Sequence, residues 1–206
     1  MKNIRAPSGA RATQLARAFE RPPITVAVID TGVDYNHEDL TSAMWRSPKD
    51  PHVVGYDFAH DKPLPFDVKQ FDPKGYFKCL ENPKCAADTR TLRQFLATPG
   101  HGTHCAGHTS ATEQNAKGIR GVGAGSQVMA LKFFYDVGDE NAGAGDDAAA
   151  VRSIDYAVQN GAKIISASWG ARMPGSLAEG SELKRAIERA RDAGVLFVVA
   201  AGNDGI

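Results

Sequence analysis

The chain has 206 residues, and its 24 basic and 24 acidic side chains give a net charge of zero at neutral pH. This length allows one α/β domain with a sizeable core, and the even scatter of charge argues against nucleic acid as a partner. The longest apolar run, residues 195–201, is too short to cross a membrane, and residues 1–15 contain no apolar segment of a signal peptide. We therefore expect a soluble chain whose partners are neither nucleic acid nor a membrane.

The first predicted element is a buried strand at residues 24–30, ITVAVID, which is short and rich in β-branched side chains. It ends at Asp30, followed by Thr31 and Gly32. A carboxylate at the carboxyl end of a strand is well placed for catalysis, although a helix-capping Asp would explain it too. Aspartic proteases also carry Asp-Thr-Gly, but they need two such loops on an all-β scaffold, and the motif occurs once here.

Residues 45–98 are crowded with Pro, Asp, Lys and aromatic side chains and show no sustained period, which predicts a long surface insertion. Cys79 and Cys85 bracket a short loop that a disulfide could close, and such a bridge would indicate an oxidising compartment. Two surface thiols are an equally good interpretation. With three cysteines, at least one thiol is free or pairs outside the chain.

The next motif is HGTHCAGH, residues 101–108. His104 and His108 stand four apart like the ligands of a zinc protease, but Cys105 occupies the position of the catalytic Glu, and a Cys among small residues is more often a core side chain. The alternative is that His101, between two glycines, lies exposed at a helix N-terminus and faces Asp30. A base needs an orienting acid, and this chain has both in the order Asp, then His.

The remaining elements alternate between strands and helices. Helices are predicted from Asp146 to Gly161 and from Ser181 to Gly194, because the first opens with two acidic residues that suit a helix N-terminus, the second begins at a capping serine, and each stops at a glycine. Buried strands are predicted at residues 128–134, 163–168 and 195–201. This alternation predicts an α/β fold, a three-layer doubly wound parallel sheet whose chemistry lies at the carboxyl ends of the strands. Just past the last strand, the side-chain amide of Asn203 could donate to an oxyanion, although alone it would be a turn residue.

Four motifs in this order, VAVIDTGVDYNHEDL, HGTHCAGH, SASWG and VVAAGNDG, resemble those of the subtilisin-like serine peptidases. The resemblance runs from about Ile24 to the end of the chain and implies a serine endopeptidase acting on proteins or peptides. It implies that Asp30 orients the base, that His101 is the general base and acid, and that Asn203 is the oxyanion donor. It also implies a thiol at Cys105, behind the catalytic histidine, that is buried and sensitive to mercurials.

The same resemblance implies a substrate cleft. One wall, which pairs with the substrate backbone, is expected from Ser168, Trp169 and Gly170. The facing edge and the rest of the pocket wall are expected from five small residues: Gly143, Ala144, Gly145, Ala200 and Gly202.

A calcium site is a further expectation from the resemblance. Its side-chain ligands would be Asp39 and Asn115, and its backbone carbonyls those of Glu113, Lys117 and Ile119, an oxygen-only set that suits Ca²⁺. A polar loop that caps a helix is the alternative interpretation.

The nucleophile of the family lies in a Gly-Thr-Ser segment well beyond the oxyanion Asn, whereas this sequence stops at Ile206. None of Ser110, Ser166 and Ser168 has that context. We therefore expect a fold that is incomplete at its C-terminus, a chain that is inactive alone, and a missing C-terminal part of the catalytic domain as its partner. Half of a split protease and a non-catalytic peptide-binding module on the same fold are the alternatives. By family resemblance, the parent protein is expected to be secreted.

Overall fold

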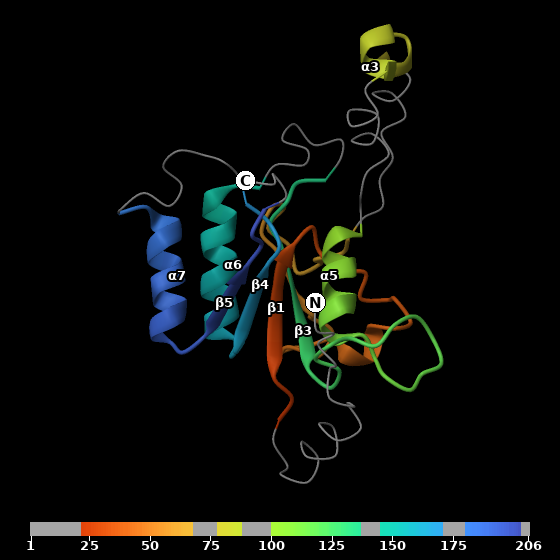
Figure 1. Ribbon diagram of the computed structural model, residues 1–206. Helices are drawn as coiled ribbons and strands as arrows, with labels where there is room; N and C mark the ends of the chain where they lie inside the picture. Colours follow the sequence, from red (N-terminus) through yellow and green to blue (C-terminus); the bar gives the residue numbers. More distant parts are fainter. Residues whose placement is uncertain (1–21, 68–77, 88–99, 137–144, 171–179, 203–206) are drawn as a thin grey trace, which may run out of the picture.

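The computed structural model describes residues 22–67, 78–87, 100–136, 145–170 and 180–202. Its centre is a five-stranded parallel sheet with the strand order β2-β3-β1-β4-β5 (Figure 1). The strands are β1 Thr25–Asp30, β2 Gly55–Asp57, β3 Gln127–Lys132, β4 Ile164–Ala167 and β5 Leu196–Val199. Among the described residues, no helix combines the length and apolar character that crossing a membrane requires.

Helices cover both faces of this sheet. Helices α6 and α7 lie on one face and α5 on the other (Figure 1). The longer helices are α5 His101–Ser110, α6 Asp147–Gln159 and α7 Glu182–Asp192; the short ones are α3 Pro83–Ala87 and the 3-10 helix η1 Thr41–Ala43. The predicted three-layer α/β architecture is therefore confirmed.

The two cores follow from the alternation of side chains along the strands. Ala27 and Ile29 of β1 pack toward α6 and α7, whereas Val28 packs toward α5 and its buried Ala106. Because β1 is covered on both faces, all six of its residues are buried. This explains why its sequence is a continuous apolar run rather than an alternating one.

Local signals set the ends of α6 and α7 as predicted. The Asp146 carboxylate accepts the N–H groups of Ala148 and Ala149, and the Ser181 hydroxyl accepts the N–H group of Lys184. Gly161 and Gly194 follow the helices with positive φ angles, which glycine adopts without strain.

The segment 45–98 needs a correction at its beginning. Residues 55–57 form β2, an edge strand paired with β3, and Trp45, Val54 and Phe58 are buried, so this part belongs to the core rather than to a surface insertion. A three-residue strand is too short to show a period. It contains Gly55 because a Cβ there would lie 1.7 Å from the carbonyl oxygen of Ala130. Residues 68–77 and 88–98 lie outside the described residues.

Cys79 is disulfide-bonded and Cys105 is free. The side chain of Cys85, the predicted partner of Cys79, lies outside the described residues.

Candidate active site

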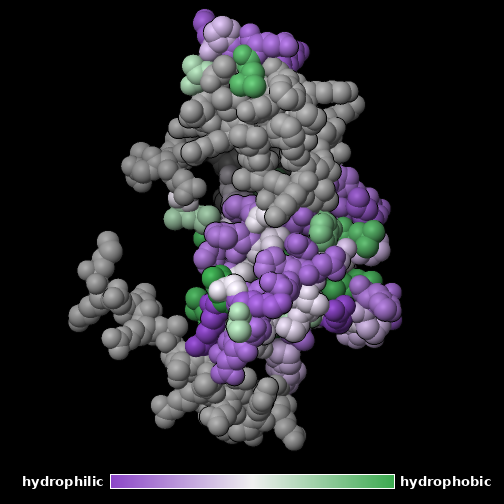
Figure 2. Space-filling model, turned by 90° about the vertical axis from the view of Figure 1, so that its right-hand side faces the viewer, coloured by the Kyte–Doolittle hydropathy of each residue, from purple (hydrophilic) through white to green (hydrophobic). Residues whose placement is uncertain are grey.

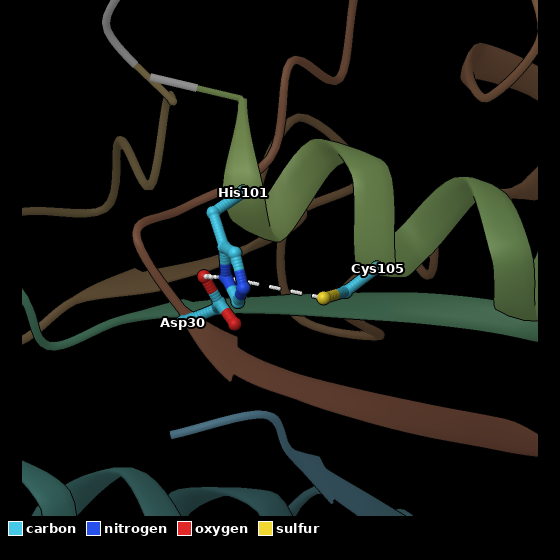
Figure 3. A group of neighbouring side chains, drawn as sticks. All are labelled: Asp30, His101 and Cys105. Carbon is cyan, nitrogen blue, oxygen red and sulfur yellow. Dashed lines mark hydrogen bonds and ion pairs between the residues drawn. The ribbon is translucent and has the colours of Figure 1, made fainter. Parts of the chain in front are cut away.

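Asp30 and His101 lie together at the carboxyl edge of the sheet. Asp30 is the last residue of β1, and His101 is the first residue of α5, as the sequence predicts. The Nδ1 atom of His101 is 2.7 Å from Oδ1 of Asp30 (Figure 3). Because a carboxylate only accepts hydrogen bonds, this contact keeps the proton on Nδ1 and leaves Nε2 free to accept one.

The two side chains differ in their access to solvent. Asp30 is fully buried, whereas the side chain of His101 is 48% exposed. The imidazole can therefore meet a substrate, and the carboxylate can act only through the imidazole. This is the division of roles that a general base with an orienting acid requires.

Burial is the main influence on the charge of Asp30. It raises the pKa of this carboxyl above its ordinary value of 3.8, and the hydrogen bonds from His101 and from the Thr31 N–H, at 2.8 Å, oppose the rise. The second oxygen, Oδ2, is buried and has no hydrogen-bond partner among the described residues. A carboxylate held at such a cost is typical of a functional site rather than of a structural one.

Two glycines allow close packing around the turn after β1. A Cβ at Gly102 would lie 2.1 Å from the carbonyl oxygen of Gly32 and 3.2 Å from Oδ1 of Asp30. A Cβ at Gly32 would lie 2.7 Å from the carbonyl oxygen of Pro65, and its φ of 103° is left-handed. Gly102 is therefore a steric requirement of the contact between α5 and β1, and Gly32 is one for the packing of Pro65 and Phe66 on the turn.

Cys105 lies one helical turn after His101, with its sulfur 3.9 Å from Nδ1 of that histidine (Figure 3). It is half-buried rather than fully buried as predicted, and burial raises the pKa of its thiol. Asp30, His101 and Cys105 form the one group of three possible metal ligands within the part of the chain that the structure describes. An ion there would occupy the acid–base pair.

The zinc-protease interpretation of His104 and His108 finds no support. The two imidazoles pair with each other, with 3.2 Å between their Nε2 atoms, on the exposed side of α5. In the described ranges, no third His, Cys, Asp or Glu joins them in a ligand group.

Part of the predicted substrate cleft lies at the same edge of the sheet. Ser168, Trp169 and Gly170 follow β4, which pairs with β1. The indole Nε1 of Trp169 donates to the carbonyl oxygen of Ile29 at 2.8 Å, and its ring packs on that of Phe133. Trp169 is therefore anchored directly before Asp30, an attachment that the sequence alone did not predict.

The other cleft residues are only partly described. Gly145 forms a bridge with Phe134, and a Cβ on it would lie 2.2 Å from the ring of Phe133. Ala200 and Gly202 are exposed just past β5. Gly143, Ala144 and the predicted oxyanion donor Asn203 lie outside the described residues.

The predicted calcium ligands come together, but they do so through hydrogen bonds. Oδ1 of Asp39 accepts the side-chain N–H of Asn115 at 2.7 Å, and Oδ2 accepts the backbone N–H of Ile119 at 3.0 Å. Lys117 pairs with Glu38 through its side chain, and Glu113 pairs with Arg120. Both oxygens of Asp39 thus face N–H donors, and the calcium site stays a prediction.

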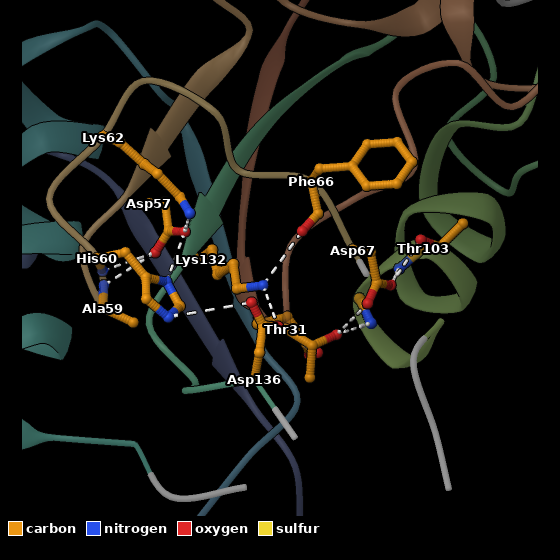
Figure 4. A network of polar contacts seen from close by, with 12 residues as sticks. Thr31, Asp57, Ala59, His60, Lys62, Phe66, Asp67, Thr103, Lys132 and Asp136 are labelled. Carbon is orange, nitrogen blue, oxygen red and sulfur yellow. Dashed lines mark hydrogen bonds and ion pairs between the residues drawn. The ribbon is translucent and has the colours of Figure 1, made fainter. Parts of the chain in front are cut away.

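Sequence analysis missed one buried carboxylate at the site. Asp67 is 3% exposed and hydrogen-bonds Thr31, next to Asp30, and Thr103, in the first turn of α5 (Figure 4). It lies in the irregular segment that was predicted to be a surface insertion. No periodicity, cap signal or motif marked it.

Known proteins resemble this chain over most of its length. The model of the Subtilase family matches residues 22–205. The major intracellular serine protease of Bacillus subtilis is 32% identical over 205 residues, covering 100% of this chain and 49% of that protein. Thermitase of Thermoactinomyces vulgaris is 29% identical over 180 residues, covering 87% of this chain and 47% of that protein.

Solved structures agree with these relatives. A cold-adapted subtilisin-like serine proteinase has a TM-score of 0.55 at 23% identity, covering 87% of this chain and 46% of that one, a likeness that shows the fold alone. Fervidolysin from Fervidobacterium pennivorans has a TM-score of 0.53 at 28% identity, covering 87% of this chain and 21% of that one. The chain spans about half the length, or less, of these relatives. The family match and the Asp30–His101 geometry together show that the chain belongs to the subtilase family of serine proteases.

Proposed function

We propose that this chain carries the acid–base half of a serine endopeptidase whose nucleophilic serine is contributed by further residues. The observation that carries the proposal is the contact of 2.7 Å between the exposed imidazole of His101 and the buried carboxylate of Asp30. Both lie at the carboxyl edge of the sheet, where the chemistry of open α/β folds is found.

In the proposed mechanism, Nε2 of His101 takes the proton of the serine hydroxyl as that hydroxyl attacks a peptide carbonyl. The same imidazole then gives the proton to the leaving amine. Asp30 holds the proton on Nδ1 and offsets the positive charge that forms on the ring. Asn203 is proposed to donate its amide N–H to the oxyanion, and loss of such a donor costs about 3 to 4 kcal/mol of transition-state stabilisation.

Residues 1–206 alone are proposed to be inactive. Among the described residues, no serine hydroxyl bonds to the ring of His101. Ser110 is fully buried and bonds Ser126 instead. Removing the nucleophile from a triad costs on the order of a millionfold in rate.

The substrate is proposed to be an extended peptide that lies between the Ser168–Gly170 segment and the Gly145 edge. The Cβ position of Gly145 faces the ring of Phe133, so the backbone of this edge, rather than the space left by a missing side chain, is proposed to pair with the peptide as an added strand.

An extracytoplasmic location is proposed from the disulfide of Cys79, since disulfides persist in oxidising compartments. The names of the relatives include both an extracellular and an intracellular location. The extracellular basic protease of Dichelobacter nodosus is 29% identical over 194 residues, and the protease of Bacillus subtilis described above is named as intracellular. Thiol titration of the protein isolated from each cell fraction tests this proposal.

The test of the function uses the full-length protein with a panel of peptide substrates. His101→Ala is expected to lower kcat by about a millionfold and Asp30→Asn by about ten thousandfold. Asn203→Ala is expected to lower kcat by about a hundredfold with KM nearly unchanged. His104→Ala is the matched control, because His104 lies on the same helix and contacts His108 rather than Asp30.

Hydrolysis that survives His101→Ala would exclude the proposed mechanism. Binding of peptides by the full-length protein without any hydrolysis would favour the peptide-binding module instead.

A further inference from the structure

Residues 65–67 lie across the turn that follows β1. The N–H of Val33 donates to the carbonyl oxygen of Pro65 at 2.9 Å, and the buried Lys132 donates from Nζ to the carbonyl oxygen of Phe66 at 3.2 Å (Figure 4). The ring of Phe66 meets that of Tyr35 edge-on, with 5.2 Å between centroids. The segment is therefore attached to β3 and to the turn that carries the catalytic carboxylate.

The carboxylate of Asp67 connects this turn to α5. Oδ1 accepts the hydroxyl of Thr31 at 3.1 Å, and Oδ2 accepts both the N–H of Thr103 at 3.0 Å and its hydroxyl at 2.6 Å. Thr31 directly follows Asp30, and Thr103 lies two residues after His101. One buried side chain thus bonds both elements whose separation sets the distance between the acid and the base.

These bonds also supply the cap that α5 lacks locally. Its N-cap residue is Gly100, which has no side chain to accept the free N–H groups of the first turn. The N–H of Gly102 donates instead to the hydroxyl of Thr31 at 3.0 Å, and the N–H of Thr103 donates to Asp67. A carboxylate at this position also complements the positive end of the helix dipole.

We propose that Asp67 is a positioning residue for the Asp30–His101 pair, and the catalytic consequence of this role rests on the proposed function. In Asp67→Asn an NH2 group replaces one of the two acceptor oxygens, so either the hydroxyl of Thr31 or the two donors of Thr103 lose their acceptor. The turn and the helix then become free to shift relative to each other. A displacement of about 1 Å at a catalytic pair can cost about a hundredfold in rate.

A purely structural role for Asp67 makes a different prediction, and Asp57 offers the matched control. Asp57 is 1% exposed, and its Oδ1 accepts the backbone N–H groups of Ala59 and His60 (Figure 4). Its Oδ2 lies 2.8 Å from Nδ1 of the His60 ring. None of its hydrogen bonds goes to Thr31 or Thr103. Asp67→Asn and Asp57→Asn therefore both disturb a buried carboxylate, and only Asp67→Asn removes the connection to the catalytic pair.

The experiment compares these two variants in the full-length protein. Asp67→Asn is expected to lower kcat by about tenfold to a hundredfold, with KM changed by about twofold or less. Asp57→Asn is expected to lose stability to urea without a comparable loss of kcat. Equal losses of kcat in the two variants at equal stability would overturn the proposal.

A second pair of variants covers the case in which Asp67→Asn does not fold. Thr31→Val keeps the shape of the side chain but removes the hydroxyl that bonds Asp67 and Gly102, whereas Thr31→Ser keeps the hydroxyl. Thr31→Val is expected to reproduce the loss of kcat and Thr31→Ser to restore most of it. A Thr31→Ser variant as impaired as Thr31→Val would contradict the role of the hydroxyl.

Proton NMR of the Nδ1–H of His101 separates this inference from the proposed function, since it needs no activity. The low-field resonance that a hydrogen bond to Asp30 produces is expected to shift or broaden in Asp67→Asn and to stay in place in Asp57→Asn. An unchanged resonance in both variants would refute the positioning role even if the protein hydrolyses peptides. A selective shift would support it even if the protein does not.

Discussion

At the scale of single residues, Asp30 carries the clearest sign of function because its position is unfavourable for stability. The carboxyl group is fully buried, one of its oxygens lacks a partner among the described residues, and burial raises its pKa. A neutral side chain of the same shape would avoid the cost of burying the charge. The proposed role of Asp30 in orienting His101 would explain why a charged group lies here.

The free-energy cost of burying the charge of Asp30 leads to a prediction for Asp30→Asn. The variant is expected to be at least as stable as the wild type at neutral pH, although its activity falls. Below about pH 4 the wild-type carboxyl is protonated in both the folded and the unfolded state, so the two proteins should be equally stable. As the pH rises through the raised pKa, the wild type loses stability relative to the variant, because the buried group must ionise.

Urea unfolding of both proteins between about pH 4 and about pH 7 measures this difference. A stability gap that narrows with rising pH would show that the hydrogen bonds to Asp30 outweigh its burial.

At the scale of elements, the contact between α5 and β1 depends on the absence of one side chain. Gly102→Ala is expected to lower the free energy of unfolding by about 2 kcal/mol, because its Cβ would overlap the carbonyl oxygen of Gly32. It should also lower kcat, since α5 carries His101. Gly107→Ala on the same helix is the control, because its Cβ would meet only the Ile119 side chain, at 3.9 Å.

Gly107→Ala is expected to be neutral or to stabilise the protein by about 0.5 to 1 kcal/mol, as alanine does inside a helix. Urea unfolding and peptide hydrolysis give both quantities. Similar effects of the two alanines would disprove the steric role of Gly102.

Asp39→Ala tests whether the loop around Asp39 binds calcium or is held by hydrogen bonds alone. Because both carboxylate oxygens accept N–H groups, Asp39→Ala is expected to destabilise the protein by about 1 to 3 kcal/mol with or without calcium. The melting temperature should not change when a chelator is added. A fall of the melting temperature on chelation that Asp39→Ala abolishes would establish the calcium site that family resemblance implies.

At the scale of the whole molecule, the sheet is covered unevenly. Leu196 and Val198 of β5 are 60% and 47% exposed, and they pair in register with Ile164 and Ser166 on the face that carries α5. Helix α5 contacts β1 and β3. The described surface on the α5 side is mostly hydrophilic, with small separate apolar areas (Figure 2). Exposed apolar side chains along an edge strand favour association with further protein.

Residues 1–206 alone are therefore expected to self-associate, and Val198→Lys should reduce this association without unfolding the chain. Sedimentation velocity measures the first effect and circular dichroism the second. In the full-length protein, the same substitution should lower stability by about 1 to 3 kcal/mol if further chain covers this face. A full-length variant of unchanged stability would show that β5 is exposed there too.

The sequence by itself determined the elements whose signals are local. The prediction included the runs of β1, β3, β4 and β5, the acidic start of α6, the cap at Ser181, and the placing of Asp30 and His101 at element ends, because periodicity and capping act between near neighbours. The contact between Asp30 and His101 was predicted because a base exposed at a helix N-terminus needs an orienting acid, and because the resemblance to the subtilisin-like peptidases assigns these roles to the two residues.

Only the tertiary structure decided the rest. Strand β2 exists because β3 offers it a partner, Trp169 is anchored because the carbonyl oxygen of Ile29 lies beside it, and Asp67 bonds Thr31 and Thr103 across 36 positions of sequence. Each of these depends on groups that are distant in sequence. Hydrogen bonds and packing between such groups leave no pattern among neighbouring residues, so they became visible only when the sheet brought the segments together.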